Sequence, residues 1–171
     1  MAAPEFSVPL QDLLKLRTSL SREAFLLQHP SPVLLIPRAS NLENDPFRTQ
    51  VLPVDAPDAP SPVAQFSVAP VQKRRGAPQQ SFVWVGREPG CDVVLAYEGV
   101  SKLQAHFSRR PDGELELLDA NSTNGTFVND KRLAANEPAV MKDQTRLRFG
   151  PVSVRFRTAA GLWDELGKLG R

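Results

Sequence analysis

Strand-like alternation fills the larger, C-terminal part of the chain, and this feature most constrains the fold. From residue 65 onward, apolar and polar side chains alternate with a period of two, as on a strand that buries one face. Turn residues separate these segments, and Asp112-Gly113 is the strongest hairpin signal among them. Many short strands at regular spacing predict an all-β sandwich. The expected strands are 65–68, 81–85, 92–95, 105–108, 114–118, 126–128, 145–149 and 152–156.

The residues before this region have helical character. Leucines recur at helical spacing over residues 7–20, and we expect a second short helix over 22–28, capped by Ser21. An apolar strand follows at 32–37. Because prolines bound it and proline cannot donate to a β-ladder, we expect this strand at a sheet edge. Two short helices cannot bury all their leucines between themselves, so these side chains either pack on the sandwich or bind another chain.

Composition divides the chain into four parts. Residues 1–37 form the helical segment with its short edge strand, and residues 38–62 form a proline-rich linker. Residues 63–158 form the sandwich, and residues 159–171 form a C-terminal helix with an apolar face. The composition of the linker favours a spacer over a docking or kinase-target segment.

The net charge and the cysteine content indicate which partners and which cellular compartment to expect. The 171 residues contain 21 Lys and Arg against 19 Asp and Glu, and the net charge of +2 indicates neither a nucleic-acid nor a membrane partner. The one cysteine, Cys91, allows no internal disulfide and is compatible with a reducing compartment. The N-terminus has no signal-peptide pattern, and no apolar run approaches the roughly 20 residues that cross a bilayer. We therefore expect a cytoplasmic protein.

Three polar motifs stand where the expected strands give way to loops. Arg87 follows a strand and a glycine, and its guanidinium presents donors in a planar fork that matches a phosphate. Ser101 and Lys102 follow a turn and offer a hydroxyl and an ammonium group. Asn124, followed by Gly125, offers a carboxamide that can both donate to and accept from an extended peptide. Loops at one end of a rigid sandwich often carry a binding surface, so these residues are candidates for an anion- and peptide-binding site.

The ordered set of motifs resembles the forkhead-associated (FHA) domain family. The resemblance covers residues 62–157 and rests on Gly86-Arg87, Cys91-Asp92-Val93-Val94-Leu95, Val100-Ser101-Lys102, Ala105 and Ser122-Thr123-Asn124-Gly125-Thr126-Phe127-Val128-Asn129. It implies a mainly β fold: a sandwich of about eleven strands, here with an N-terminal helical segment and a C-terminal helix. It also implies a phosphothreonine-peptide site in the loops at one apex of the sandwich.

The resemblance assigns phosphate binding to three residues. Arg87 matches the arginine that grips the phosphate, and Ser101 matches the serine whose hydroxyl contacts the same group. Lys102 stands where the family usually has arginine. Lysine keeps the positive charge but loses the bidentate geometry, so we expect weaker phosphate binding rather than none.

A second group of residues contacts the peptide or supports its loop. Asn124 matches the asparagine that clamps the peptide backbone, Gly125 is the glycine that lets the loop turn, and Thr123 lines the same loop. Gln104 replaces a histidine that commonly supports the binding loop, and glutamine can form similar hydrogen bonds. His106 lies two residues further along the same strand face, and we expect it to share this supporting role.

The resulting hypothesis is a non-catalytic adaptor that binds a phosphothreonine-containing protein or peptide in Ser/Thr kinase signalling. Its partner would be the kinase or one of its substrates. The alternative is a phosphate-independent scaffold or oligomerisation subunit, which would form a homo-oligomer through the N-terminal helices. An enzyme is disfavoured because the sequence offers no nucleophile–base pair and no nucleotide loop. His29 and His106 lack partners at metal-ligand spacing, so we expect no metal and no cofactor.

Overall fold

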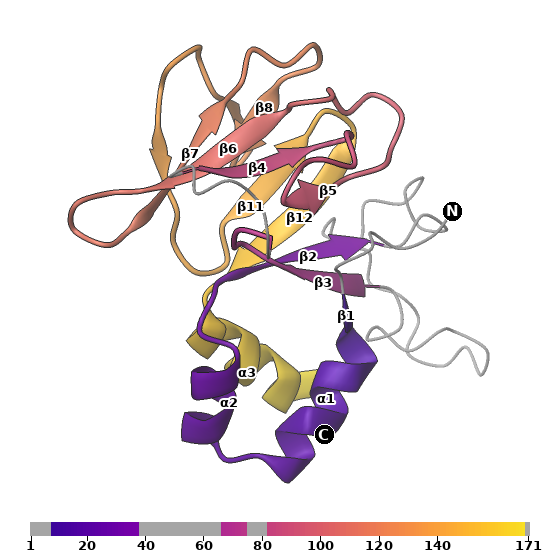
Figure 1. The fold of residues 1–171 in the computed structure, drawn as a ribbon, viewed down its shortest axis with the longest axis vertical. Helices are drawn as coiled ribbons and strands as arrows, with labels where there is room; N and C mark the ends of the chain where they lie inside the picture. Colours follow the sequence, from indigo (N-terminus) through magenta and orange to yellow (C-terminus); the bar gives the residue numbers. More distant parts are fainter. Residues whose placement is uncertain (1–7, 38–65, 75–81, 170–171) are drawn as a thin grey trace.

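Two β-sheets form the body of the protein in this computed structural model, which describes residues 8–37, 66–74 and 82–169 (Figure 1). The strands of the larger sheet are β1 (Val8–Pro9), β2 (Val33–Pro37), β3 (Phe66–Pro70), β8 (Thr126–Val128), β9 (Lys131–Arg132), β11 (Arg146–Phe149) and β12 (Val152–Arg157). The strands of the smaller sheet are β4 (Val83–Gly86), β5 (Val93–Val94), β6 (Ala105–Arg109), β7 (Leu115–Asp119) and β10 (Ala139–Val140).

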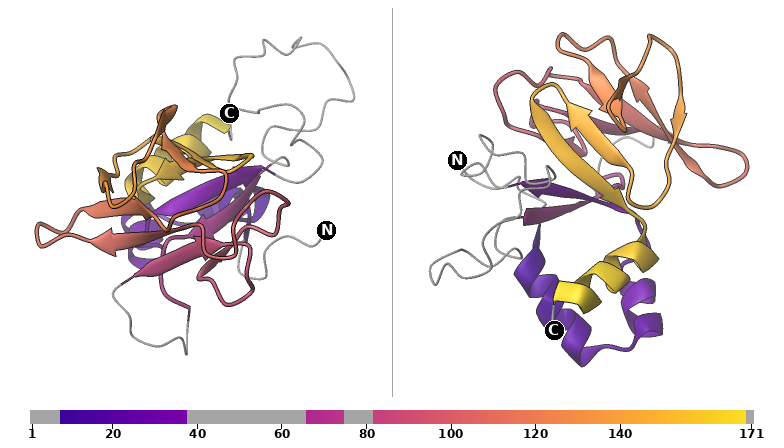
Figure 2. Two further views of the ribbon diagram at one scale, coloured as in Figure 1. Left: turned by 90° about the horizontal axis from the view of Figure 1, so that it is seen from above. Right: turned by 180° about the vertical axis from the view of Figure 1, so that it is seen from behind.

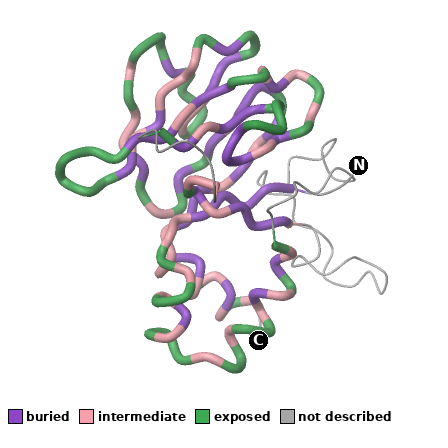
Figure 3. The backbone as a smooth tube through the Cα atoms, viewed as in Figure 1, coloured by how far each residue is buried: buried purple, intermediate pink, exposed green. Residues whose placement is uncertain are grey.

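The strand order brings distant parts of the chain into one sheet. The larger sheet has the order β1-β3-β2-β12-β11-β8-β9, and the smaller sheet has the order β10-β7-β6-β4-β5. Both sheets contribute to one apolar core, in which the ring centroids of Phe107 from β6 and Phe156 from β12 lie 6.2 Å apart. Figure 3 shows buried stretches along the strands and exposed residues at the loop tips. The mainly β sandwich predicted from the alternating pattern is confirmed.

The prediction of an edge strand at residues 32–37 is wrong. Strand β2 lies inside the larger sheet, between β3 and β12, and pairs with both. Its side chains are buried on both faces: Leu34 and Ile36 point into the sandwich core, whereas Val33 and Leu35 contact the helices. A strand buried on both faces has a continuous apolar sequence rather than an alternating one. Pro37 ends the strand, so it does not interrupt the ladder in its interior.

Three helices lie together at one end of the molecule, next to β1, β2 and β3 (Figure 1). They are α1 (Leu10–Ser19), α2 (Arg22–Gln28) and α3 (Ala159–Leu169). Ser21 caps α2 as predicted, because its hydroxyl accepts a hydrogen bond from the backbone N–H of Ala24 at 3.3 Å. The helices cover one part of the outer face of the larger sheet through a second apolar cluster, whose buried members are Leu10, Leu13, Phe25, Val33, Leu35, Val68, Leu162 and Leu166.

This cluster answers the question left open by the helical leucines, since Leu10 and Leu13 pack back on the sandwich. Leu27 on α2 is an exception, with 83% of its surface exposed. None of the described helices is both long enough and apolar enough to span a membrane. The predicted linker at 38–62 lies outside the described residues.

A buried arginine joins the end of β12 to α3. The side chain of Arg157 is only 2% exposed, and it forms ion pairs with Asp143 at 3.0 Å and with Glu165 of α3 at 2.8 Å. The same guanidinium donates to the backbone carbonyl of Gly161 at 2.7 Å. A charge removed from water needs such partners to avoid a large desolvation penalty. Arg157 therefore fixes the orientation of the terminal helix against the sheet.

Candidate functional site

Three loops meet at one end of the sandwich. This is the end at which β12 begins, whereas α3 follows the other end of the same strand. The backbone N–H of Arg87, just after β4, donates to the carbonyl of Ser101 at 2.9 Å. The backbone N–H of Thr123, between β7 and β8, donates to the hydroxyl of Ser101 at 3.0 Å. The hairpin between β11 and β12 joins them, since the N–H of Gly150 donates to the carbonyl of Gly125 at 2.9 Å. We call this meeting point the apex.

Arg87 is anchored at the apex but keeps donors for a ligand. Its Nε donates to the carbonyl of Val100 at 3.1 Å, which fixes the position of the guanidinium. The residue is exposed, and its two terminal Nη groups form no hydrogen bond within the described part of the chain. These two groups form the edge of the guanidinium that can contact two oxygens of one anion.

Ser101 and Lys102 stand beside Arg87 on the neighbouring loop. Because the Ser101 hydroxyl accepts from Thr123, it keeps its own hydrogen to donate to a ligand. The Lys102 side chain is exposed, while its backbone carbonyl accepts from the N–H of Glu88 at 3.2 Å. A Cβ at Gly86 would overlap this carbonyl, so only glycine allows the two loops to approach so closely. The glycine of the Gly86-Arg87 motif thus brings Lys102 next to Arg87.

Gln104 connects the two loops that carry the candidate ligand contacts. Its side chain is fully buried, with 0% exposure. The amide oxygen accepts from the backbone N–H of Ser101 at 2.9 Å. The amide nitrogen donates to the carbonyl of Gly125 and to the hydroxyl of Thr126, both at 3.0 Å. A buried amide with these three hydrogen bonds holds both loops in one geometry.

Asn124 lies exposed on the loop between β7 and β8. Its Nδ2 donates to the carbonyl of Gly99 at 2.9 Å, which leaves the amide oxygen and the second N–H for other partners. Gly125 has φ of +88°, in the left-handed region that favours glycine. The exposed side chain of Thr123 precedes Asn124, and its backbone N–H is bound to Ser101. The carboxamide of Asn124 is therefore held at the rim of the apex.

The predicted supporting role of His106 finds no support among the described contacts. Its ring lies on the outer face of the smaller sheet, with centroids 4.5 Å from Phe82 and 4.8 Å from Trp84. Among the described residues, no hydrogen bond joins this ring to the apex loops, and Nδ1 has no partner. Burial lowers the pKa of His106 below its usual value of 6.5, and the nearby carboxylate of Glu116 opposes this shift. The side chain two residues along the strand lies roughly 6.6 Å further from the apex, beyond reach of the loops.

Two residues at the apex were missed in the sequence. Gly99 supplies the carbonyl that positions Asn124, and its φ is +84°. The Glu98-Gly99 turn in the sequence was the signal that could have indicated this residue. Arg132 of β9 lies against the apex, since a Cβ on Gly125 would be 2.7 Å from its Nε. No local motif marks Arg132, because only the pairing of β8 with β9 brings it there.

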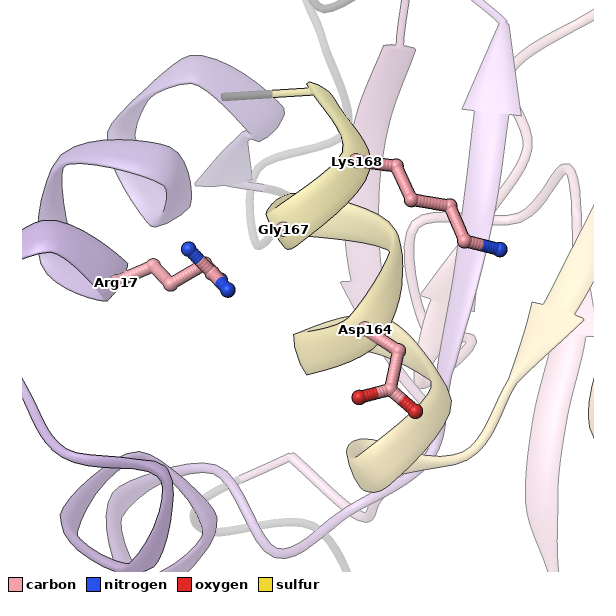
Figure 4. A pocket seen from close by; sticks show the side chains of 4 residues that line it. All are labelled: Arg17, Asp164, Gly167 and Lys168. Carbon is pink, nitrogen blue, oxygen red and sulfur yellow. The ribbon is translucent and has the colours of Figure 1, made fainter. Parts of the chain in front are cut away.

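A hollow of about 550 Å³ lies away from the apex, between α1 and α3 (Figure 4). Arg17 points toward α3 there, its Nε donates to the carbonyl of Trp163 at 3.3 Å, and its guanidinium carbon lies 4.7 Å from the Trp163 ring centroid. Asp164, Gly167 and Lys168 of α3 complete the lining. Through these contacts, Arg17 links α1 to α3.

The described residues contain no group of three or more His, Cys, Asp or Glu side chains that could hold a metal ion. Cys91 is buried, and burial raises the pKa of its thiol, with the nearby Glu88 carboxylate adding to the effect. A thiol in this state is a poor nucleophile. The chemistry that the apex offers is therefore hydrogen bonding and positive charge.

Comparison with known proteins finds a family model that matches the part of the chain that carries the apex. Residues 83–150 match the family model described as "FHA domain". The chain is 29% identical over 139 residues to the oxoglutarate dehydrogenase inhibitor of Corynebacterium glutamicum. This match covers 81% of this chain and 86% of that protein. It is 40% identical over 63 residues to kanadaptin of Homo sapiens, a match that covers 31% of this chain and spans only 8% of kanadaptin.

A solved structure shares the fold. The crystal structure of the FHA domain of CT664 protein from Chlamydia trachomatis superimposes with a TM-score of 0.50 at 14% identity, covering 74% of this chain and 96% of that one. At this level of identity the likeness concerns the fold alone.

Proposed function

We propose that this chain, whose residues 83–150 match the FHA domain family model, is a non-catalytic adaptor that binds phosphothreonine peptides at the apex. The observation that carries this proposal is the convergence of three loops at Ser101, whose carbonyl accepts from Arg87 and whose hydroxyl accepts from Thr123, so that Arg87 and Asn124 lie at one site. The inhibitor from Corynebacterium glutamicum, which resembles most of this chain, supports a regulatory role. The partner is a protein phosphorylated by a Ser/Thr kinase, or the kinase itself.

The phosphate would be held by three groups on two loops. A phosphothreonine carries a charge of about −1.5 to −2 at neutral pH and three acceptor oxygens. The terminal Nη groups of Arg87 and the hydrogen of Ser101 Oγ supply charge-assisted and neutral donors, and the ammonium of Lys102 adds a second positive charge. Each hydrogen bond to a charged group contributes roughly 1.5–3 kcal/mol when desolvated, so three of them support micromolar binding.

The peptide backbone would be held by Asn124. Its amide oxygen accepts from a peptide N–H, and its second N–H donates to a peptide carbonyl. The hydrogen bond to Gly99 fixes the carboxamide before the ligand arrives, which lowers the entropy cost of binding. Thr123 lines the same rim. Main-chain recognition of this kind is compatible with many peptide sequences around the phosphothreonine.

Fluorescence anisotropy with a degenerate phosphothreonine peptide library tests the proposal. We expect wild-type protein to bind, Arg87→Ala to bind at least about tenfold more weakly, and an unphosphorylated library not to bind. Arg22→Ala is the matched control, because Arg22 is an exposed arginine on α2, far along the chain from the apex. Equal binding by wild type and Arg87→Ala, or binding by neither, would contradict the proposal. Light scattering on the same samples tests the scaffold alternative, which requires a stable oligomer unaffected by Arg87→Ala.

A further inference from the structure

The outer face of the larger sheet is covered by helices over only part of its width. The helices pack on Val33 and Leu35 of β2 and on Val68 of β3. The strands β12, β11, β8 and β9 continue the same sheet beyond them. In the right-hand view of Figure 2, β11 and β12 face the reader with the helices gathered below them. Helix α3 also lies against β12 through Arg157, but the apolar cluster that holds the helices contains no residue of β11, β8 or β9.

Arginines gather on that second part because of the strand register. Arg132 of β9 pairs with Phe127 of β8, and Phe127 pairs with Arg148 of β11, so the three side chains share one face. Leu147 and Phe149 on either side of Arg148 point into the core, which places Arg148 on the outside. We call Arg132, Phe127 and Arg148 the arginine row.

Arg148 is held in a fixed position within the row. Its guanidinium carbon lies 3.5 Å from the centroid of the Phe127 ring, a cation–π contact. Its Nη1 donates to the carbonyl of Gly150 at 2.8 Å. A guanidinium fixed by two contacts loses little freedom when its other donors bind a ligand.

Arg132 packs beside Phe127 at Gly125. A Cβ at Gly125 would lie 2.7 Å from Arg132 Nε and 3.1 Å from the Phe127 ring, so both side chains pack where Gly125 leaves space. Within the described residues, no ion pair involves Arg132 or Arg148. Arg146, one row further along, is paired with Asp130. The row therefore presents two neighbouring guanidinium groups without an acidic partner among those residues, and that of Arg148 is held in place.

We infer that the arginine row binds an acidic, carboxylate-bearing segment of a partner protein, at a surface that adjoins the apex at Gly125 and Gly150 but does not include Arg87 or Ser101. Guanidinium groups bind carboxylates through paired hydrogen bonds, and two neighbouring ones favour a segment with several Glu or Asp residues. The chain as a whole has a net charge of only +2, so this face differs in charge from the average surface. Charge complementarity of this kind also accelerates association.

The row suits carboxylates better than nucleic acid. Single-stranded nucleic acid is bound by stacking bases on exposed aromatic rings beside a basic groove. Here one face of the Phe127 ring carries the Arg148 guanidinium, and Arg132 packs beside the same ring at Gly125. The aromatic ring thus positions the arginines instead of offering a surface for a base.

Anisotropy with a fluorescein-labelled oligoglutamate peptide tests the inference on the full chain. We expect binding to wild type that weakens as salt is added, no binding of an oligoglutamine peptide, and about tenfold weaker binding to Arg132→Gln/Arg148→Gln. Arg22→Gln/Lys142→Gln removes the same charge from exposed positions outside the row and should bind as wild type. Arg132→Gln alone, an exposed substitution, should also weaken binding with an unchanged thermal melting curve.

Three further measurements separate this site from others. Arg87→Ala and Ser101→Ala should both bind oligoglutamate like wild type. Loss of oligoglutamate binding in Arg87→Ala would mean that the carboxylates occupy the phosphate site of the apex and would overturn the inference. Equal binding by wild type and the double arginine variant would overturn it as well. Tighter, row-dependent binding of an oligouridylate of equal length would replace the acidic protein with nucleic acid and so refute it.

Discussion

The backbone N–H of Thr123 donates to the hydroxyl of Ser101 over 3.0 Å, a hydrogen bond between loops 22 residues apart in the sequence. One small side chain therefore joins the two loops and keeps its own hydrogen free for the proposed ligand contact. Ligand affinity and loop geometry are coupled at this residue. The same coupling extends inward, since the N–H of Ser101 donates to the buried amide of Gln104.

Substitution Ser101→Ala should reduce both binding and stability. The loss of the hydroxyl removes a phosphate donor and leaves the N–H of Thr123 without its acceptor, so we expect about tenfold weaker phosphothreonine-peptide binding and about 1 kcal/mol lower stability. Isothermal titration calorimetry and urea unfolding measure the two effects. Ser101→Thr, which keeps a hydroxyl, is the control and should retain most of the stability. Unchanged affinity in Ser101→Ala would show that this hydroxyl does not contact the ligand.

Substitution Gln104→Leu should destabilise the protein more than a surface change. It preserves the approximate volume but leaves the N–H of Ser101 and the carbonyl of Gly125 without this partner in a buried site. An unsatisfied buried polar group costs roughly 1–3 kcal/mol, so we expect a decrease of about 3 kcal/mol in the free energy of unfolding. Urea denaturation measures it. A change below that of a control such as Arg22→Ala would mean that the loops do not depend on Gln104.

The protonation of His106 should make stability depend on pH. Burial lowers its pKa in the folded state below the value of 6.5 that it has when unfolded. The unfolded chain therefore binds a proton first as the pH falls, and stability should decrease from about pH 6.5 down to the folded-state pKa. Thermal melting between about pH 7 and about pH 5 measures this slope. His106→Gln should have a shallower slope, and identical slopes would contradict the prediction.

Removing the guanidinium of Arg157 should loosen α3. Arg157→Ala leaves the carboxylates of Asp143 and Glu165 facing each other across a cavity, and breaking a buried ion pair in this way costs roughly 3–5 kcal/mol. Because both carboxylates are partly exposed, we expect the lower end of this range. Urea unfolding gives the energy, and the fluorescence of Trp163 on α3 reports the local change. A loss under about 1 kcal/mol would show that the ion pairs contribute little net stability.

The sequence predicts best where one residue pattern determines the structure. Alternation with a period of two predicts the strands of the sandwich, and Ser21 three residues before Ala24 predicts the N-cap of α2. The ordered motifs around Arg87, Ser101 and Asn124 indicate the loops that meet at the apex. The roles of these side chains in ligand binding remain predictions.

The features missed in the sequence depend on which strands pair. Proline at both ends suggested an edge for β2, but its neighbours β3 and β12 are separated from it by long stretches of chain. The same applies to Arg132 and Arg148, which flank Phe127 only through the register of β9, β8 and β11. The prediction for His106 relied on its sharing a strand face with Gln104. Only Gln104 contacts the apex loops, whereas the His106 ring contacts Phe82 and Trp84.

The interior position of β2 determines where this protein can be cut. A fragment that starts after the proline-rich segment lacks the strand between β3 and β12, so two ladders lose their hydrogen-bond partners at once. Open edges of that kind recruit strands from other molecules and promote aggregation. A unit that keeps the larger sheet intact therefore includes β2, so the part of the chain that matches the FHA domain model depends on residues ahead of the 83–150 match.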